Sequence, residues 1–266
     1  TDRLDAVNLV LKLLRYLQGD RRVWAVARVP TVEQEDLRHL YRELAQLKRE
    51  RVRHCNRIRA LGVLHGVVIR PGRSFQRDLD EARQWDEEPL PPRVVARLER
   101  DHRRLLEVDA QIGELVEERK RLLEERAYPA VNKAHALMQV RGIGAESAWL
   151  FALEFFGWRT FRNRREVAAA AGLCPTPHQS GGLDREQGIS KGGNKRVRTM
   201  LVELAWLWLR YQPTSALSVW FRDRFGGTNK RSRRIGATAL ARKLLIALWK
   251  YVEFGVVPEG AVIASN

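Results

Sequence analysis

Ser180 stands between Gln179 and Gly181 in a glycine-rich stretch, shortly before a dense group of basic residues. A serine hydroxyl can attack a phosphodiester when nearby positive charge neutralises the phosphate and fixes the line of attack. The residues that follow supply that charge and one amide: Lys191, Asn194, Lys195, Arg196 and Arg198. We therefore expect Ser180 to lie in a loop that runs directly into a basic helix. A flexible turn before a solvated helix is the alternative for a Ser-Gly-Gly taken alone.

The position of these cations indicates what the helix binds. A helix N-terminus favours anions, because its free N–H groups and the macrodipole present positive charge there. Cations crowded onto that end are unfavourable unless an external polyanion is present. Ser190 lies beside Lys191, where a helix N-cap is useful, so we expect it to be structural or to contact phosphate instead of acting as a nucleophile.

Two further basic segments are candidate phosphate contacts. Residues 137–148 have the form of a helix, a Gly-x-Gly turn and a second helix, which predicts a helix-hairpin-helix unit with Arg141, Gly142 and Gly144 at the turn. A tight turn between two helices also needs glycine, so this pattern is weak by itself. Four cations open the last predicted helix, over residues 235–251, and repeat the arrangement after Ser180: Lys230, Arg231, Arg233 and Arg234.

Two carboxylates, Asp2 and Asp5, stand at the head of an apolar segment that predicts a helix ending near Gly19. Their spacing of three places them on one face of the first turn. An ordinary acidic N-terminal turn is the alternative, because acids there stabilise a helix. Residues 23–27 then predict a short buried strand.

The charge of the chain favours a nucleic-acid partner. Its 48 Lys and Arg residues exceed its 32 Asp and Glu residues, which gives a net charge of +16 and a pI near 10.6. Residues 129–266 contain 21 basic and 9 acidic residues, a net of +12, against +4 for residues 1–128. The C-terminal half is therefore the expected surface for a polyanion.

Length, cysteines and hydropathy limit the class of protein. The 266 residues, 44% of them hydrophobic, can bury a large core, which we expect to be divided between two compact parts joined by something elongated. Cys55 and Cys174 are too few for a disulfide framework or a zinc site, which favours a reducing cytoplasm. The most apolar run, residues 201–209, contains Glu203, so we expect no spanning helix and no membrane partner.

Long helices connect the candidate sites. Leucines spaced by three and four predict one amphipathic helix from residue 31 to residue 61, and a linker rich in proline follows over residues 66–92. Residues 94–122 then form an unbroken heptad seam with two polar positions, Asp101 and Arg119. The seam can pack back on the first long helix or pair with a second subunit. Trp206, Trp208, Trp220 and Phe221 are expected in the core.

Three motifs, in this order along nearly the whole chain, resemble one known family. They are Thr-Asp-Arg-Leu-Asp-Ala at residues 1–6, Val-Arg-Gly-Ile-Gly at 140–144, and Gln-Ser-Gly at 179–181 followed by Gly-Ile-Ser-Lys-Gly-Gly-Asn-Lys-Arg-Val-Arg at 188–198. The chain resembles the one-ten insertion-sequence family of DEDD transposases, the bridge-RNA-guided recombinases. The last motif is specific, whereas the Gly-x-Gly turn is not.

The resemblance implies a RuvC-like domain with four acidic residues, a coiled coil, and a C-terminal transposase domain whose serine attacks DNA. Asp2 and Asp5 match the last two acids and would hold Mg²⁺, and Ser180 matches the attacking serine. The implied partners are donor and target DNA, a guide (bridge) RNA, and further copies of the chain in a dimer or tetramer. The implied location is the prokaryotic cytoplasm, in association with the nucleoid. The strands that would supply the other two acids are absent from this sequence, so the metal site cannot be completed from this chain.

The sequence therefore predicts a mostly α fold. We expect residues 1–65 to hold the remnant of a RuvC-like α/β domain and the first long helix, residues 66–128 the linker and coiled coil, and residues 129–266 a compact helical transposase domain with the helix-hairpin-helix unit. The expected function is RNA-guided DNA recombination through a covalent serine-DNA intermediate. The alternative is a non-catalytic nucleic-acid-binding protein, or a truncated and inactive transposase remnant.

Overall fold

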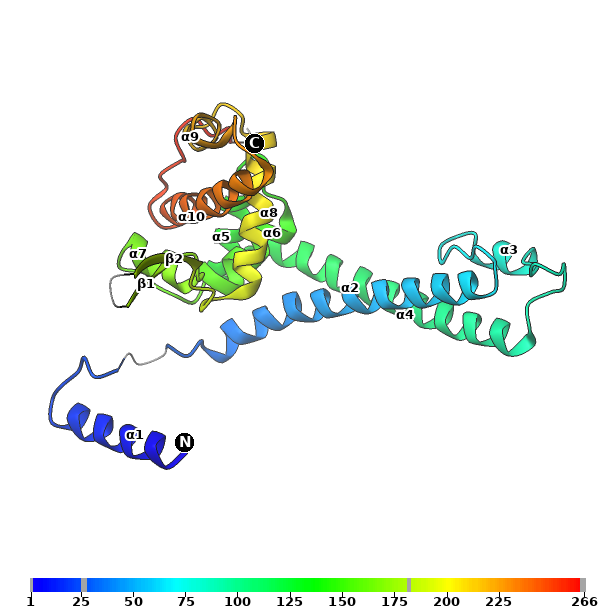
Figure 1. Ribbon diagram of the computed structural model, residues 1–266, viewed down its shortest axis with the longest axis horizontal. Helices are drawn as coiled ribbons and strands as arrows, with labels where there is room; N and C mark the ends of the chain where they lie inside the picture. Colours follow the sequence, from blue (N-terminus) through cyan, green and yellow to red (C-terminus); the bar gives the residue numbers. More distant parts are fainter. Residues whose placement is uncertain (1, 25–27, 181–182, 264–266) are drawn as a thin grey trace. The chain divides into compact units, whose positions relative to one another are not determined.

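The computed structural model describes residues 2–24, 28–180 and 183–263, and it describes no side chain from residue 177 to residue 187. These residues form helices and one β-hairpin (Figure 1), so the predicted mostly α fold is confirmed. The chain divides into two units, Thr1–Thr31 and Val32–Asn266. The three predicted domain ranges stay predictions.

The first unit consists of helix α1 (Asp2–Leu17) and the segment that follows it. The helix ends as expected, since Gly19 adopts φ +101°, a conformation that glycine tolerates. No α1 side chain is buried, and Leu4 and Leu17 are 65% and 70% exposed. The strand predicted over residues 23–27 is not formed at Val23 and Trp24, which lie in a bend, and its other three residues lie outside the described part of the chain.

The second unit contains a two-helix arm. Helices α2 (Val32–Leu64) and α4 (Pro92–Glu125) lie side by side, joined through the short helix α3 (Phe75–Asp80) (Figure 1). The predicted seam is therefore used within the chain: Leu98 and Leu105 are buried in the cluster that contains Ile58 of α2. The polar seam residue Asp101 is also buried, with Arg57 and Arg104 at 3.2 and 3.3 Å.

A compact helical body follows the arm. Its elements are α5 (Pro129–Met138), α6 (Ala145–Phe151), the π-helical turn η1 (Ala152–Phe156), α7 (Arg164–Ala170), α8 (Lys195–Tyr211), α9 (Ala216–Phe225) and α10 (Lys230–Phe254). Of the aromatic residues expected in the core, Trp208 and Phe221 are buried. Trp220 is only partly buried, and Trp206 is 37% exposed. The indole of Trp208 donates to the Ser215 hydroxyl at 2.8 Å, so its burial leaves no unmet donor.

The body also contains a β-hairpin that the sequence analysis did not predict. Strand β1 (Pro175–Ser180) pairs antiparallel with β2 (Leu183–Ile189), and the last pair is Ser180 with Leu183. The two residues between these partners are both glycine, the composition typical of a two-residue hairpin turn. The first strand could not be predicted from the sequence, because it contains Pro175 and Pro177 and proline is uncommon within strands. The register is irregular there.

Within the described ranges, none of the helices combines the length and the apolar character that crossing a membrane requires.

Candidate functional site

Ser180 is the last residue of β1, and not part of a loop that enters a helix directly. Strand β2 and residues 190–194 separate it from α8, which begins at Lys195. The backbone of Ser180 is therefore fixed by its pairing with Leu183. Its side chain is outside the described part of the chain, so the nucleophile assignment stays a prediction.

Three backbone hydrogen bonds join residues 190–194 to the last residue of α7 and to the segment between α7 and β1. Ser190 N donates to Cys174 O at 2.8 Å, Lys191 N to Gly172 O at 3.2 Å, and Asn194 N to Ala170 O at 2.9 Å. The segment can approach α7 this closely because Gly193 has no side chain. A Cβ at this position would lie 2.2 Å from the carbonyl oxygen of Ala170. The segment between the hairpin and α8 thus has one packed conformation.

The N-cap of α8 is Asn194, and the expectation that Ser190 lies at a cap is wrong. The Asn194 side-chain oxygen accepts from the backbone N–H groups of Arg196 and Val197 at 3.0 and 3.3 Å, which satisfies donors at the helix start. Lys191 was expected in the first turns of this helix but precedes it, exposed and with φ +57°. The Asn194 side chain thus has an internal role, and its expected contact with nucleic acid stays a prediction.

The other predicted cations of α8 differ in how far they are held by the protein. Lys195 is exposed and forms no ion pair with a described carboxylate. Arg196 is half exposed and reaches Glu154 at 3.5 Å. Arg198 donates through Nη1 to Ala171 O at 3.1 Å and to Gly193 O at 3.5 Å, so part of its guanidinium supports the 190–194 segment. Their binding of nucleic acid stays a prediction.

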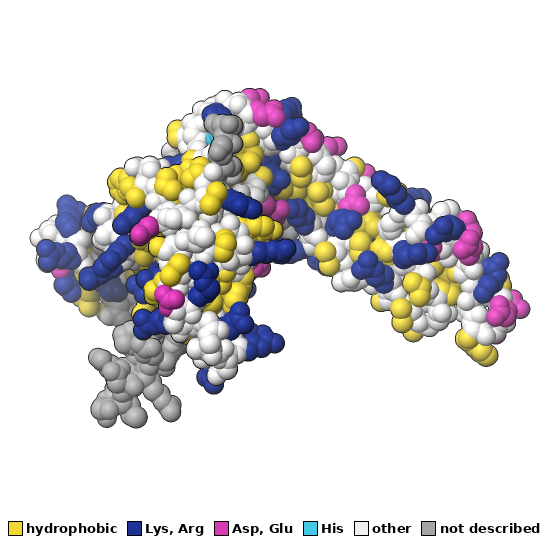
Figure 2. Space-filling view, turned by 90° about the horizontal axis from the view of Figure 1, so that it is seen from above, with side chains coloured by type: hydrophobic (Ala, Val, Ile, Leu, Met, Phe, Trp, Pro, Cys, Tyr) yellow, Lys and Arg dark blue, Asp and Glu magenta, His cyan; other side chains and the backbone are white. Residues whose placement is uncertain are grey.

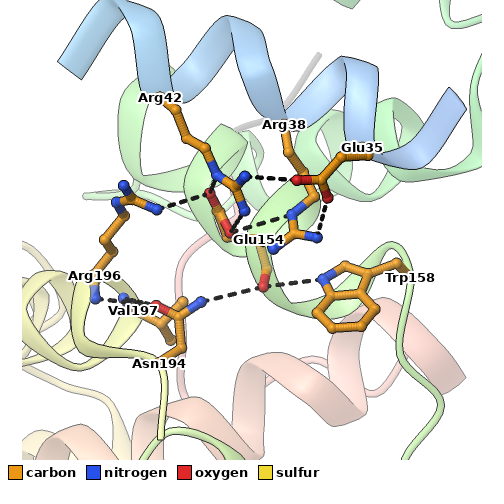
Figure 3. Close-up of polar contacts among 8 residues, drawn as sticks. All are labelled: Glu35, Arg38, Arg42, Glu154, Trp158, Asn194, Arg196 and Val197. Atoms are coloured by element: carbon orange, nitrogen blue, oxygen red, sulfur yellow. Dashed lines mark hydrogen bonds and ion pairs between the residues drawn. The ribbon is translucent and has the colours of Figure 1, made fainter. Parts of the chain in front are cut away.

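Glu154, on η1, is the centre of an arginine cluster (Figure 3). Arg42 Nε lies 2.8 Å from Glu154 Oε1, and Arg38 Nη2 lies 3.0 Å from Oε2. Arg196 approaches the same carboxylate from α8. Glu35 accepts from Arg38 and Arg42 on their other side, at 2.5 and 2.6 Å. The cluster therefore joins the start of α2, the π-helical turn and the start of α8.

The backbone of Glu154 is also used. Its carbonyl oxygen accepts from the indole N–H of Trp158 at 3.1 Å and from the side-chain amide of Asn194 at 3.4 Å. The guanidinium groups of Arg38 and Arg159 lie over the Trp158 ring, with Cζ 4.7 and 4.2 Å from its centroid. The N-cap of α8 and the arginine cluster are thus connected through one residue.

Burial and ion pairing act against each other on Glu154, whose side chain is 1% exposed. Burial disfavours the ionised form, but hydrogen bonds and charge from Arg42 and Arg38 outweigh it, so the pKa of Glu154 lies below its ordinary value. The hydrogen bond to Glu154 raises the pKa of Arg42. The Glu154 carboxylate is therefore ionised at neutral pH.

Sequence reasoning singled out neither Glu154 nor its partners on α2. The available signal was weak: Arg38 lies between Leu37 and the other leucines of an apolar helix face, and Glu154 interrupts an apolar run of aromatic residues. Buried charged residues are rare unless they are paired, so each of them predicts a partner without identifying it. Their sequence separation of 116 residues explains why the pair was missed.

Packing within the protein explains one of the two glycines in the turn between α5 and α6. Gly142 adopts φ +94°, and a Cβ there would lie 3.0 Å from the side chain of Tyr211. Gly144 caps α6, and a Cβ there would meet nothing within 4 Å. Arg141 is exposed, while its backbone N–H donates to Val262 O at 3.1 Å. The helix-hairpin-helix assignment stays a prediction.

The cations at the start of α10 are all exposed. These cations are Lys230, Arg231, Arg233 and Arg234, and none of them pairs with a carboxylate in the described part of the chain. Asn229 caps the helix. On the face drawn in Figure 2, basic side chains are spread over the body and the arm and are not confined to a single stripe. A polyanion could therefore contact several elements of this unit.

Asp2 and Asp5 both lie exposed in the first turn of α1. Carboxylate oxygens are suitable ligands for Mg²⁺, which commonly uses one or two of them. The described residues contain no group of three or more His, Cys, Asp or Glu that could enclose a metal ion. The donor type thus fits magnesium, but the set of ligands is only partial.

Comparisons with known proteins give one family. Residues 134–219 match the family described as "Transposase IS116/IS110/IS902 family". "Putative transposase y4rJ" of Sinorhizobium fredii (strain NBRC 101917 / NGR234) is 46% identical over 280 residues, which cover 100% of this chain and 69% of that protein. The transposase for insertion sequence element IS1328 of Yersinia enterocolitica is 30% identical over 230 residues, 85% of this chain and 66% of that protein. The transposase for insertion sequence element IS1111A of Coxiella burnetii (strain RSA 493 / Nine Mile phase I) is 28% identical over 239 residues, 89% of this chain and 61% of that protein.

The chain thus spans about two thirds of the length of the curated relatives that it matches. The strongest of these similarities extends over the whole chain, well beyond the 134–219 segment. We conclude that this chain belongs to the IS116/IS110/IS902 family of insertion-sequence transposases.

Proposed function

We propose that this chain is the part of a DNA transposase that cleaves and exchanges DNA strands, with Ser180 as the nucleophile. The observation that carries the proposal is the position of Gln179-Ser180-Gly181, which lies inside the segment that matches the family, at the end of a strand whose partner β2 leads toward the basic start of α8. The end of a paired strand suits a nucleophile, because the ladder fixes the backbone that carries the hydroxyl.

In this reaction the Ser180 hydroxyl oxygen attacks the phosphorus of a DNA phosphodiester. A bond from Oγ to phosphorus forms, the bond from phosphorus to a deoxyribose oxygen breaks, and the proton of the hydroxyl passes to that leaving oxygen. A hydroxyl of the exchanging strand then attacks the same phosphorus and releases Ser180 with its proton. Positive charge from Lys191, Lys195 and the α8 start would stabilise the additional charge on phosphate.

Partners follow from the charge and the family. We propose that donor and target DNA bind the C-terminal half, whose net charge is +12, and that a guide (bridge) RNA selects them. The exchange of two DNA segments requires more than one active serine, so the proposed assembly is a homo-oligomer, a dimer or a tetramer. The proposed location is the prokaryotic cytoplasm, on the nucleoid.

We also propose that Asp2 and Asp5 contribute two oxygen ligands to Mg²⁺. The bound ion would neutralise charge on a DNA phosphate. No step of the serine reaction above depends on it.

A non-catalytic nucleic-acid-binding protein is the second candidate. The observation in its favour is the partial carboxylate set, since Asp2 and Asp5 have no third acid in a metal-binding group among the described residues. The basic helix starts of α8 and α10 would then serve only to contact phosphate.

Replacing the serine distinguishes the two candidates. In the full-length protein, Ser180→Ala should abolish recombination and the covalent protein-DNA adduct while leaving the affinity for nucleic acid nearly unchanged, because only a transition-state role is lost. Ser190→Ala is the matched control and should retain the adduct. An adduct that persists in Ser180→Ala and disappears in Ser190→Ala would reverse the assignment. A wild-type protein that binds DNA with no adduct and no recombination would favour the second candidate.

A further inference from the structure

A polar cavity of about 470 Å³ adjoins the Glu154 cluster. It lies between the start of α2, η1, α7 and the segment that enters α8. Four arginines line it, together with one carboxylate, that of Glu154: Arg38, Arg42, Arg159 and Arg196. This volume is within the usual range of ligand sites, about 300–1,000 Å³, but the lining is charged and not apolar.

The charges lining the cavity do not cancel. Glu154 and the neighbouring Glu35 together neutralise two of the four guanidinium groups, and both acids bind the same two arginines, Arg38 and Arg42. Arg196 is only at the edge of this pairing, 3.5 Å from Glu154 and half exposed. The cavity therefore retains about two positive charges in excess, and it favours an anion.

Arg159 is the arginine that the protein itself uses least. It stacks on Trp158 and pairs with no carboxylate among the described residues. Burial, followed by the positive charge of Arg38, lowers its pKa, so an additional anion would relieve an unfavourable environment. A guanidinium that lies over a ring without a carboxylate partner still has N–H groups with which to bind the oxygens of a phosphate.

Gly192 and Gly193 also line the cavity. The close approach to Ala170 explains why residue 193 is a glycine. No such reason applies to Gly192, because a Cβ there would meet nothing within 4 Å and its φ is not positive. Neither of their N–H groups donates to a described backbone carbonyl. A glycine that the fold does not require, at the rim of a cationic cavity, lets a ligand approach the backbone closely.

We propose that this cavity binds a phosphodiester of a nucleic-acid strand, with Arg159 as a binding residue, and thereby positions the strand beside the hairpin that carries Ser180. The proposal rests on the proposed function, since it assumes a nucleic-acid substrate. Residues 190–194 supply both the cavity wall and the covalent continuation of β2, and β2 pairs with β1 up to Ser180. A phosphate held here is thus fixed relative to the backbone of the hairpin.

The test compares Arg159→Gln with Arg162→Gln, which removes the same charge three residues away from an exposed side chain outside the cavity. The probe is a fluorescent single-stranded oligonucleotide, as DNA and as RNA of the same sequence, titrated at several salt concentrations. Arg159→Gln should weaken binding about tenfold and reduce the log-log salt slope by about 0.7, the value for one phosphate contact on a single strand. If Arg159→Gln weakens binding of only one of the two probes, that probe identifies whether the cavity binds DNA or RNA. If Arg159→Gln and Arg162→Gln behave alike with both probes, the proposal is overturned.

A second measurement separates this proposal from the proposed function. Inorganic phosphate should raise the melting temperature of the wild type and of Arg162→Gln more than that of Arg159→Gln, because a ligand that binds the native state stabilises it. Equal shifts in all three proteins would overturn the cavity even if Ser180→Ala had lost its adduct. Conversely, a selective loss in Arg159→Gln alongside a persistent adduct in Ser180→Ala would overturn the nucleophile and retain the cavity.

Discussion

Glu154→Gln tests whether the buried carboxylate is what joins α2, η1 and α8. The substitution keeps the shape of the side chain and removes its charge. Glu154 is 1% exposed and accepts from Arg38, Arg42 and Arg196. Removing one partner of a buried ion pair typically costs about 3–5 kcal/mol, and here it leaves Glu35 as the only carboxylate paired with Arg38 and Arg42 among the described residues. We therefore expect the free energy of unfolding to fall by about 3 kcal/mol or more.

Glu35→Gln is the matched control, because Glu35 accepts from Arg38 and Arg42 at 2.5 and 2.6 Å but its side chain is 35% exposed. Exposed pairs contribute about 0–1 kcal/mol, since water screens them and the charges remain solvated when separated. The measurement is urea unfolding followed by circular dichroism, with the m value compared between variants. Equal losses in Glu154→Gln and Glu35→Gln would refute the reasoning from burial.

Acid titration gives an independent result for the same residue. The folded protein holds the pKa of Glu154 below its ordinary value of 4.5, so the unfolded chain takes up this proton first as the pH falls. The stabilisation from Glu154 is therefore fully present above that ordinary value and is lost below it. The wild type should lose more stability than Glu154→Gln as the pH falls below about 4.5. Identical acid profiles would mean that folding does not lower the pKa of Glu154.

Two further predictions concern the arm and the segment before α8. Leu105→Glu should cost about 3 kcal/mol or more in thermal or urea unfolding, because Leu105 is buried in the seam, whereas Leu106→Glu, at a position 55% exposed, should stay within about 0.5 kcal/mol. Equal behaviour of these two variants would place the seam in solvent. Gly193→Ala should destabilise the protein, because its Cβ would lie 2.2 Å from Ala170 O, whereas Gly192→Ala should fold normally, since its Cβ meets nothing. A stable Gly193→Ala protein with an unchanged melting temperature would contradict that close approach.

The helices could be predicted from the sequence because their periodicity is local. The heptad residues Leu98 and Leu105 are buried as their spacing indicates, and α4 runs from Pro92 to Glu125 without a break. The choice between an internal and an intermolecular partner could not be predicted, since an apolar seam fits any complementary helix. Gly142 is limited in the same way. The local sequence predicts a turn there, but its neighbour Tyr211 lies 69 residues further along the chain and could not be predicted.

The candidate site was harder to predict than the helices. The motif around Ser180 is recognisable in the sequence, yet its strand conformation depends on a partner strand and on a proline-rich first half that disguises it. Serine and asparagine are both common N-cap residues, so the sequence allows either Ser190 or Asn194 to cap α8. The structure assigns the cap to Asn194, because the helix begins at Lys195. The arginine cluster combines residues from α2, η1 and α8, and no local pattern brings these elements together.

The α2–α4 arm makes the arginine cavity the base of a lever. Arg38 and Arg42 belong to the first turns of α2, and the helix continues for 22 residues beyond Arg42 to Leu64. At 1.5 Å per residue this places the end of the arm roughly 30–40 Å from the cavity. A tilt of about 5° at the base then moves the far end by roughly 3 Å, with no bending of either helix. A ligand that tilted α2 at Arg38 and Arg42 would therefore displace the far end of the arm by much more than it displaced the two guanidinium groups.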